Sequence, residues 1–338
     1  MQSVSQLREE IRRVQATDIN YSEKFGAGET ITIAVVDSIL DVSFLDDSEL
    51  TTGKQQNYIA SDDPFTTPHG ANVLGAISWY APDAIYDLHR IVIDSGDIKP
   101  SNCLKAMAEI RDGSVDIANI SAGVHHADCQ QQCRMCQAAQ EVADSGTIIV
   151  AGAGNDLHGQ EKTMYCPALS DHTISVGSFE AVCTCSVSNS RSRYRQTPEI
   201  FPPGAYWIRE TANEHPGEPV NQTFCSRRNC APGHTCDTYR KERISDQSVD
   251  FRLGEPDVFA PDHLAYERPT GAAGIERGSS YATAIVSGAL GGILSKLSEE
   301  RVLPTPDEIN HALNRLNETV GNTPYRRFDS ESLYHELV

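Results

Sequence analysis

Three residues that lie far apart in the sequence carry the side chains of a serine-based nucleophile. Asp37 ends the apolar run ITIAVVD, His69 lies near the start of a helical pattern, and Ser280 begins the run SYATAIVSG. A serine can attack a carbonyl when a histidine takes its proton, while an aspartate orients the histidine and stabilises its cation. These residue types therefore point to acyl transfer through a covalent intermediate.

Ser280 stands at the start of a predicted helix that is small or apolar on every side. The first turn of a helix offers backbone N–H groups without intrahelical partners and the positive end of the helix dipole, which both favour an alkoxide. The same position suits a serine that only caps the helix, so Ser279 or Ser280 as an N-cap is the simpler alternative. The presence of Asp37 and His69 favours the nucleophile.

The elements that would position these residues follow an alternating β/α pattern. The strand candidates are nearly continuous apolar runs, as strands buried on both faces should be: residues 31–37, 84–93, 115–123, 146–155 and 172–178. Helical patterns are expected at residues 69–79, 101–113 and 127–146, and after the N-cap Thr305. We therefore predict an α/β fold of three layers, with a doubly wound, mostly parallel sheet and helices on both faces. The last twenty residues are expected to form a surface tail.

Composition limits the partners. The 338 residues carry 47 Asp and Glu against 28 Lys and Arg, a formal charge of −19, which argues against nucleic acid as a partner. No apolar run approaches the roughly 20 residues of a spanning helix, so we expect no membrane insertion. The first fifteen residues read as an amphipathic helix without a signal-peptide core, which favours a cytoplasmic protein. A trimmed, secreted form remains the alternative, because ten cysteines suggest an oxidising compartment.

Six short blocks resemble, in order, the signature blocks of the subtilisin-like serine peptidases. The blocks are VVDS around Asp37, HGANVLG around His69, ANISAG, VAGAGN around Asn155, PDVFAP, and GSSYATAIVSG around Ser280. The chain order Asp, His, Ser is also that of subtilisin. One such block would be weak, but six in order over roughly residues 28–180 and 255–320 make the resemblance specific. It implies the subtilisin fold and a serine endopeptidase that needs no cofactor.

The resemblance also implies further site residues. The side-chain amide of Asn155 and the backbone N–H of Ser280 would bind the oxyanion of the tetrahedral intermediate. Taken alone, Asn155 could be a turn residue after glycine. Two segments would flank the side chain of a polypeptide substrate, the first by pairing with it as an extra strand: Ser121, Ala122 and Gly123, and Ala151, Gly152, Ala153 and Gly154. Their small residues could equally reflect tight packing of helix on sheet.

The sequence departs from the family pattern near Asp37. Ile39 stands where the family usually has glycine, and a β-branched residue resists a sharp turn, so the orientation of Asp37 is the least secure part of the triad. Ser279, Ala284 and Ala71 also differ from the usual residues, but none of them removes a reacting group.

A calcium site of the family is expected to be absent. Asp46 falls where many relatives have a calcium ligand, yet the loop that completes their site is too short here. Calcium needs six to eight oxygen ligands, so we interpret Asp46 and Asp47 as solvated surface and predict no metal site.

The cysteines leave three interpretations open. Cys129, Cys133 and Cys136 would share one helix face, so a disulfide would need a partner elsewhere, such as Cys103 or Cys166. The remaining cysteines lie in a long segment at about residues 181–255, interpreted as an insertion that needs staples: Cys183, Cys185, Cys225, Cys230 and Cys236. Disulfides are favoured over zinc, because the spacings in the insertion are not those of common zinc modules, and free thiols are the third possibility.

The sequence thus predicts an N-terminal helical extension at residues 1–27 and one peptidase domain at residues 28–338 that contains the insertion. The first 28 residues are too few for the folding propeptide of secreted relatives, so the chain either folds unaided or is a trimmed form. We expect a monomer. A narrower possibility is a protease that matures ribosomally made peptides, or ligates them, as in cyanobactin-type pathways, since DSILDVS has some likeness to those enzymes. A peptide-binding protein without activity is the rival from another class.

Overall fold

The structure is a computed structural model, and the residues it describes are 12, 15–16, 18–38, 50–59, 69–92, 98–124, 129–155, 164–183, 240–244, 255–267, 273–300, 303–320 and 323–338. The strands of its main sheet are β1 (Thr32–Asp37), β2 (Thr51–Asn57), β3 (Ile85–Arg90), β4 (Ile117–Ile120), β5 (Ile148–Gly152), β6 (Ile174–Cys183), β7 (Arg240–Ile244) and β8 (Val258–Pro261). A separate antiparallel hairpin consists of β9 (His263–Glu267) and β10 (Ala273–Arg277). The helices are α2 (His69–Ser78), α3 (Pro100–Arg111), α4 (Arg134–Asp144), α6 (Ser279–Glu299), α7 (Pro306–Leu313) and α8 (Ser330–Leu337).

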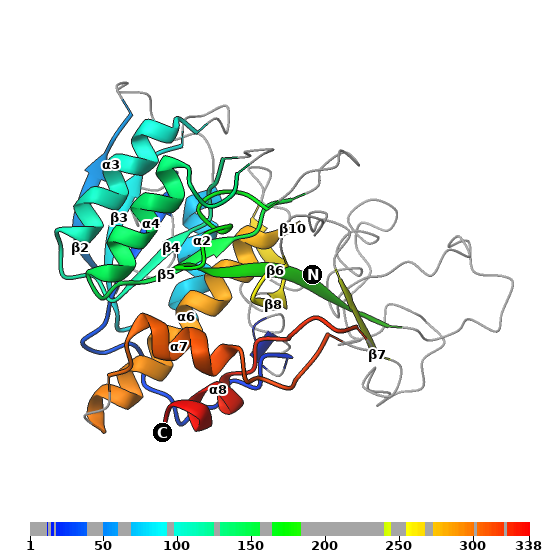
Figure 1. Ribbon diagram of the computed structural model, residues 1–338. Coiled ribbons are helices and arrows are strands. Elements are labelled where there is room, and N and C mark those ends of the chain that lie inside the picture. The colour runs from blue at the N-terminus through cyan, green and yellow to red at the C-terminus, as the bar shows by residue number, and fades with distance from the viewer. Residues whose placement is uncertain are drawn as a thin grey trace, which may run out of the picture.

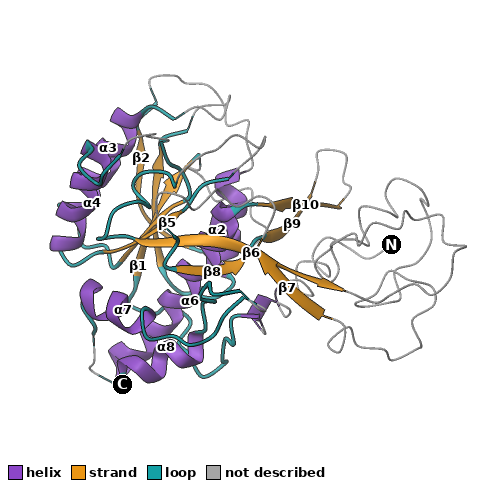
Figure 2. Ribbon diagram, turned by 45° about the vertical axis from the view of Figure 1, so that its right-hand side comes forward, coloured by secondary structure: helices purple, strands orange, loops and turns teal. Residues whose placement is uncertain are grey.

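The main sheet is doubly wound. Its order is β2-β3-β1-β4-β5-β6-β7, with β8 paired to β6. Every pairing is parallel except that of β6 with β7. Helices α3 and α4 cover one face, and α2 and α6 cover the other (Figures 1 and 2). The predicted three-layer α/β fold is confirmed.

The position of β1 between the two helical layers explains why its sequence is continuously apolar. Ile33 and Val35 belong to the core beneath α2 and α6, whereas Ala34 and Val36 belong to the core beneath α3 and α4. All four side chains are fully buried. A strand between two helical layers has no solvent face, so its sequence shows no polar alternation.

Helix α6 runs through the middle of the second core. Nearly all of its residues are buried, as its uniformly small and apolar sequence predicts. A Cβ atom on Gly288 would collide with the backbone carbonyl of Ile77, so this glycine allows α2 and α6 to approach closely. The close approach brings the N-termini of two helices, which carry His69 and Ser280, into one corner of the molecule.

Three expectations about elements are corrected. The pattern at residues 127–146 forms a helix only from Arg134, because Cys129 to Gln132 lie in a loop and Cys133 is the N-cap. The last twenty residues are not a surface tail, because Phe328 and Leu333 are fully buried and α8 packs on the core. Strands β2 and β7 were not expected at all; β2 is almost entirely polar and exposed at the sheet edge.

His89 on β3 makes the stability of the fold depend on pH. Its side chain is buried, its ring stacks on Tyr58, and its Nδ1 lies 3.0 Å from the Tyr58 hydroxyl. Burial lowers the pKa of His89 from 6.5 to about 4. Protonation below pH 6.5 therefore favours the unfolded chain, so the free energy of unfolding falls between about pH 6.5 and pH 4, by up to about 1.4 kcal/mol per pH unit from this group.

We predict that His89→Gln, which cannot titrate, removes this part of the pH dependence. Urea unfolding at pH 7 and pH 5 checks it: the wild type should lose more stability than the variant between the two pH values. An equal loss in both proteins would contradict the assignment to His89.

Candidate active site

Asp37 and His69 are brought together by the end of β1 and the start of α2. His69 Nδ1 lies 2.9 Å from Asp37 Oδ1 and 3.1 Å from Oδ2. The carboxylate is completely buried, while the imidazole side chain is 34% exposed. With Nδ1–H donating to the carboxylate, the lone pair of the ring is on Nε2. This is the tautomer that a general base requires.

Ser38 holds both partners in place, a role that the sequence did not reveal. Its backbone N–H donates to Asp37 Oδ1 at 2.6 Å, and its Oγ accepts from the N–H of Gly70 at 2.9 Å. The hydroxyl thus satisfies an N–H group in the first turn of α2, one residue after His69. The carboxylate and the helix that carries the imidazole are therefore positioned by the same residue.

Ser280 lies in the first turn of α6, next to Tyr281, which contacts His69. Its Oγ donates to the carbonyl oxygen of Ser121 at 3.2 Å, and the Ser121 hydroxyl donates to the Ser280 carbonyl oxygen at 3.0 Å. The next residue, Tyr281, stacks at an angle on His69, with ring centroids 5.6 Å apart. The predicted triad residues thus come from three elements that meet at one edge of the sheet.

Asn155 lies against the turn that precedes Ser280. Its Oδ1 accepts from the N–H of Ser279 at 2.9 Å, so the two N–H bonds of the amide remain on Nδ2. Gly278 has a φ of 148°, and a Cβ added to it would be 3.1 Å from Asn155 Nδ2. Glycine at this position therefore serves both the backbone turn and the close approach of the amide.

The two predicted substrate-flanking segments follow neighbouring strands. Residues 121–123 follow β4, and residues 151–154 span the end of β5 and the turn after it. A Cβ added to Gly123 or Gly154 would come within 2.8 Å of atoms of Tyr165, so both glycines make room for this one side chain. Tyr165, which sequence reasoning missed, packs on both segments, and its N–H donates to the Ala153 carbonyl at 3.0 Å. Packing thus explains these two glycines.

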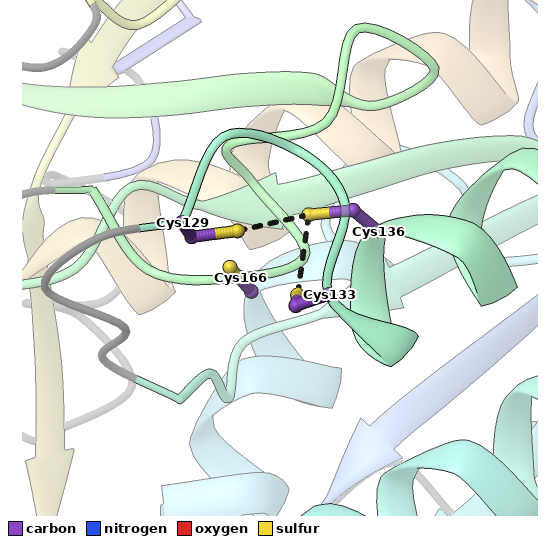
Figure 3. Close-up of side chains that lie close together, drawn as sticks. All are labelled: Cys129, Cys133, Cys136 and Cys166. Carbon is purple, nitrogen blue, oxygen red and sulfur yellow. Dashed lines mark hydrogen bonds between the residues drawn. The ribbon is translucent and has the colours of Figure 1, made fainter.

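The expected disulfides are not present among the cysteines described with side chains. A disulfide is formed by none of these five: Cys103, Cys129, Cys133, Cys136 and Cys166. Cys103 lies apart in α3, where burial raises the pKa of its thiol to about 12. The other four gather in one cluster between the start of α4 and the segment after Asn155 (Figure 3). Of the two candidate disulfide partners, Cys166 lies in the cluster without forming a disulfide, and Cys103 lies outside it.

Several sequence predictions concern residues outside the described part of the chain. They include Ile39, the proposed acidic surface at Asp46 and Asp47, and most of the cysteine-rich insertion. Within the described part, no helix combines the length and apolar character needed to cross a membrane.

Comparison with solved structures shows the same architecture elsewhere. The prenylagaramide maturation protease PagA aligns with a TM-score of 0.61 and 16% identity, over 100% of this chain and 99% of PagA. A lanthipeptide protease aligns with a TM-score of 0.63 and 16% identity, over 98% of this chain and 95% of its own. The protease domain of PatA, in a mutant form, aligns with a TM-score of 0.62 and 16% identity, over 94% of this chain and 98% of the PatA chain. None of the curated proteins compared with the sequence matches it.

The family model for the subtilase family, Peptidase S8, matches residues 28–325, which is most of the chain. This match spans all six sequence blocks and all the strands of the main sheet. The chain therefore belongs to the subtilase family of serine peptidases.

Proposed function

We propose that the protein is an endopeptidase that hydrolyses polypeptides through an Asp37–His69–Ser280 triad and an acyl-enzyme. The observation that carries the proposal is the hydrogen bond of His69 Nδ1 to the buried Asp37 carboxylate, beside the helix N-terminus that holds Ser280. Membership of the subtilase family supports the same chemistry. The four reacting groups come from different parts of the chain, and no simple structural role requires them all in one corner.

In the proposed first half-reaction, Ser280 Oγ attacks the substrate carbonyl and its proton passes to His69 Nε2. For this step the Ser280 side chain rotates, so that its hydroxyl gives up its resting hydrogen bond to the Ser121 carbonyl and donates to His69 Nε2. The imidazolium is stabilised by Asp37 and then protonates the leaving amine, so that an acyl ester and a free N-terminus result. A water molecule repeats the sequence on the ester, gives its proton to His69, and releases the carboxylate and the serine hydroxyl.

The oxyanion of each tetrahedral intermediate is proposed to accept from Asn155 Nδ2 and from the backbone N–H of Ser280. The bond between Asn155 Oδ1 and the Ser279 N–H supports this role, because it fixes the plane of the amide before substrate arrives. The position of Ser280 in the first helical turn supports the second donor, because such N–H groups have no partner within the helix.

Asn155→Ala is expected to lower kcat by about 10²- to 10³-fold with a small change in KM, a magnitude taken from the equivalent donor of subtilisin. Steady-state kinetics on a peptide substrate measure it. Asn155→Asp is the matched control, because it keeps an acceptor for the Ser279 N–H but loses both donors. If Asn155→Asp retained the activity of the wild type, the oxyanion role would be wrong and the residue would only support the turn.

The substrate is proposed to be a polypeptide that lies between residues 121–123 and 151–154. The position of residues 121–123 directly after β4, which ends at Ile120, supports this proposal, because backbone that continues a strand offers main-chain hydrogen bonds to a substrate strand. We also propose that residues 28–338 form one peptidase domain, since Leu333 of α8 shares a core with α6. The chemistry uses only protein groups.

Maturation of ribosomally made peptides is the second candidate function. It is favoured by the structural likeness, over nearly the whole of both chains, to a maturation protease and a lanthipeptide protease. In this version the acyl-enzyme is released by water, or by an amine if water is kept away.

Mass spectrometry of the products of a peptide library tests both versions. Cleaved products that each end in a new carboxylate support hydrolysis, and products that lack the mass of water and carry a new amide support ligation. Intact peptides after incubation with the wild type, across sequences and pH values, would contradict the proposed function.

A further inference from the structure

The four cysteines of the cluster Cys129, Cys133, Cys136 and Cys166 direct their sulfur atoms toward one common point. All four Sγ atoms lie within 4.8 Å of one another. The Sγ of Cys136 is 3.5 Å from that of Cys133 and 3.8 Å from that of Cys129. Figure 3 shows the side chains converging from the loop before α4, the first turn of α4, and the chain segment of Cys166.

These separations match the edges of a tetrahedron around one metal ion. Zn²⁺ binds thiolates at about 2.3 Å, which places the sulfurs of a tetrahedral site about 3.8 Å apart. The sulfurs of a disulfide are about 2.05 Å apart, well below the separations seen here. Two disulfides would also draw the four sulfurs into pairs, whereas Cys136 is in contact with two partners.

The backbone on both sides of the cluster is fixed by hydrogen bonds. Gln131 has a φ of 63°, which turns the chain tightly between Cys129 and Cys133. The side-chain Nε2 of Gln131 donates to Asp171 Oδ1 at 2.8 Å. On the other side, Cys166 and Val124 exchange backbone hydrogen bonds, both of 3.0 Å. The loop of Cys129 to Cys133 and the segment around Cys166 are thus held in place by contacts that do not involve sulfur.

Burial and electrostatics also suit a metal–thiolate centre. Cys136 and Cys166 are buried in an apolar cluster that includes Met135 and Met164. Four thiolates around Zn²⁺ carry a net charge of −2, and the N-terminus of α4, which begins right after Cys133, favours negative charge. Cys133 and Cys136 have the Cys-x2-Cys spacing of zinc modules.

We propose that Cys129, Cys133, Cys136 and Cys166 form a structural zinc site. Binding releases the four thiol protons to solvent and forms four Zn–S bonds, with no change in oxidation state. All four positions are filled by protein, so the ion has no open site for water or substrate and stabilises the fold.

The site joins the start of α4 to the segment that packs on the two proposed substrate-flanking segments. Cys166 follows Tyr165, whose ring packs on Gly123 and Gly154. Asn155 follows Gly154 directly. We therefore expect removal of the metal to loosen the contacts of Tyr165 with both flanking segments, without removing any reacting group.

Elemental analysis of the purified full chain, together with Cys166→Ser and Cys136→Ser, tests the proposal. Each variant should contain one equivalent of zinc less than the wild type. Cys103→Ala is the control, since it also changes a buried cysteine but one outside the cluster, and it should keep the full zinc content. After exchange with Co²⁺, the wild type should show the thiolate-to-cobalt charge-transfer and tetrahedral d–d bands, and the two cluster variants should lose them.

A second measurement does not depend on the folding of the variants. The native wild type is alkylated with and without a chelator, and the modified cysteines are located by peptide mass spectrometry. Protection of the four cluster cysteines that is lost with the chelator supports the site and separates it from any metal held by the cysteines of residues 183–236. Disulfide-linked peptides from the cluster, or alkylation of its four thiols at the same rate with and without chelator, would overturn the proposal.

Discussion

Ser280→Ala is expected to lower kcat by about 10⁶-fold, the size found for the nucleophile of subtilisin, another subtilase. The hydroxyl is the only protein group in the proposed mechanism that forms a covalent bond to the carbonyl carbon of the substrate, so no neighbour can replace it. The hydrogen bond from Ser280 Oγ to the Ser121 carbonyl contributes little to stability, because it is a single, partly exposed bond. The variant should therefore fold normally and still bind peptide. Steady-state kinetics measure the loss of kcat, and binding of an uncleaved peptide measures the retained affinity.

Ser279→Ala is the matched control for this prediction. Ser279 Oγ accepts from the Gly154 N–H at 3.2 Å, and the loss of such a bond costs about 1 kcal/mol, or less than about tenfold in rate. A larger loss in Ser279→Ala than in Ser280→Ala would mean that the two adjacent serines have been assigned the wrong roles.

Asp37→Asn is expected to lower kcat by about 10⁴-fold. Because the Ser38 N–H donates to Oδ1 at 2.6 Å, the asparagine would keep its oxygen there, and its NH₂ group would take the place of Oδ2, which lies 3.1 Å from His69 Nδ1. That amide would donate to Nδ1 and place the ring proton on Nε2. Nε2 must instead carry the lone pair that accepts the proton of Ser280. Single-turnover kinetics on an ester and on a peptide measure the effect on acylation.

Asp116→Asn provides the control for Asp37→Asn. Asp116 is a partly buried carboxylate that, like Asp37, accepts a backbone N–H, here from Thr32 at 2.8 Å, but it lies at the opposite end of β1. Asparagine keeps that acceptor, so kcat should be unchanged. If Asp37→Asn were as active as Asp116→Asn, the carboxylate would have no role in orienting His69.

Much of the fold could be predicted because a parallel sheet between two helical layers imposes a simple pattern. The apolar runs of β1 and β5 and the small residues of α6 have no solvent-facing positions, so the sequence marks them plainly. Strand β2 has the polar sequence TTGKQQN at an exposed edge, which carries no such pattern. Helix α8 was missed because few apolar residues, such as Leu333, anchor it, and burial of a short helix depends on tertiary contacts.

The candidate site could be predicted as a set of residue types, but not as a set of contacts. The order of Asp37, His69 and Ser280 indicated the chemistry, whereas the dual role of Ser38 depends on where α2 begins relative to β1. The cysteine cluster was misjudged for a similar reason. Its spacing suggested one helix face, but α4 begins after Cys133, and the fourth thiol comes from Cys166 in a segment placed by the sheet.

A fluorophosphonate reacts with a serine only when its hydroxyl is activated, as proposed here for Ser280 through His69 and Asp37. The full chain is therefore treated with a fluorophosphonate, and the modified residue is located by peptide mass spectrometry. We expect a phosphonyl adduct on Ser280 in the wild type and none on this residue in His69→Ala under the same conditions. An adduct on another serine, equal labelling of Ser280 in both proteins, or a folded wild type that does not react would contradict it.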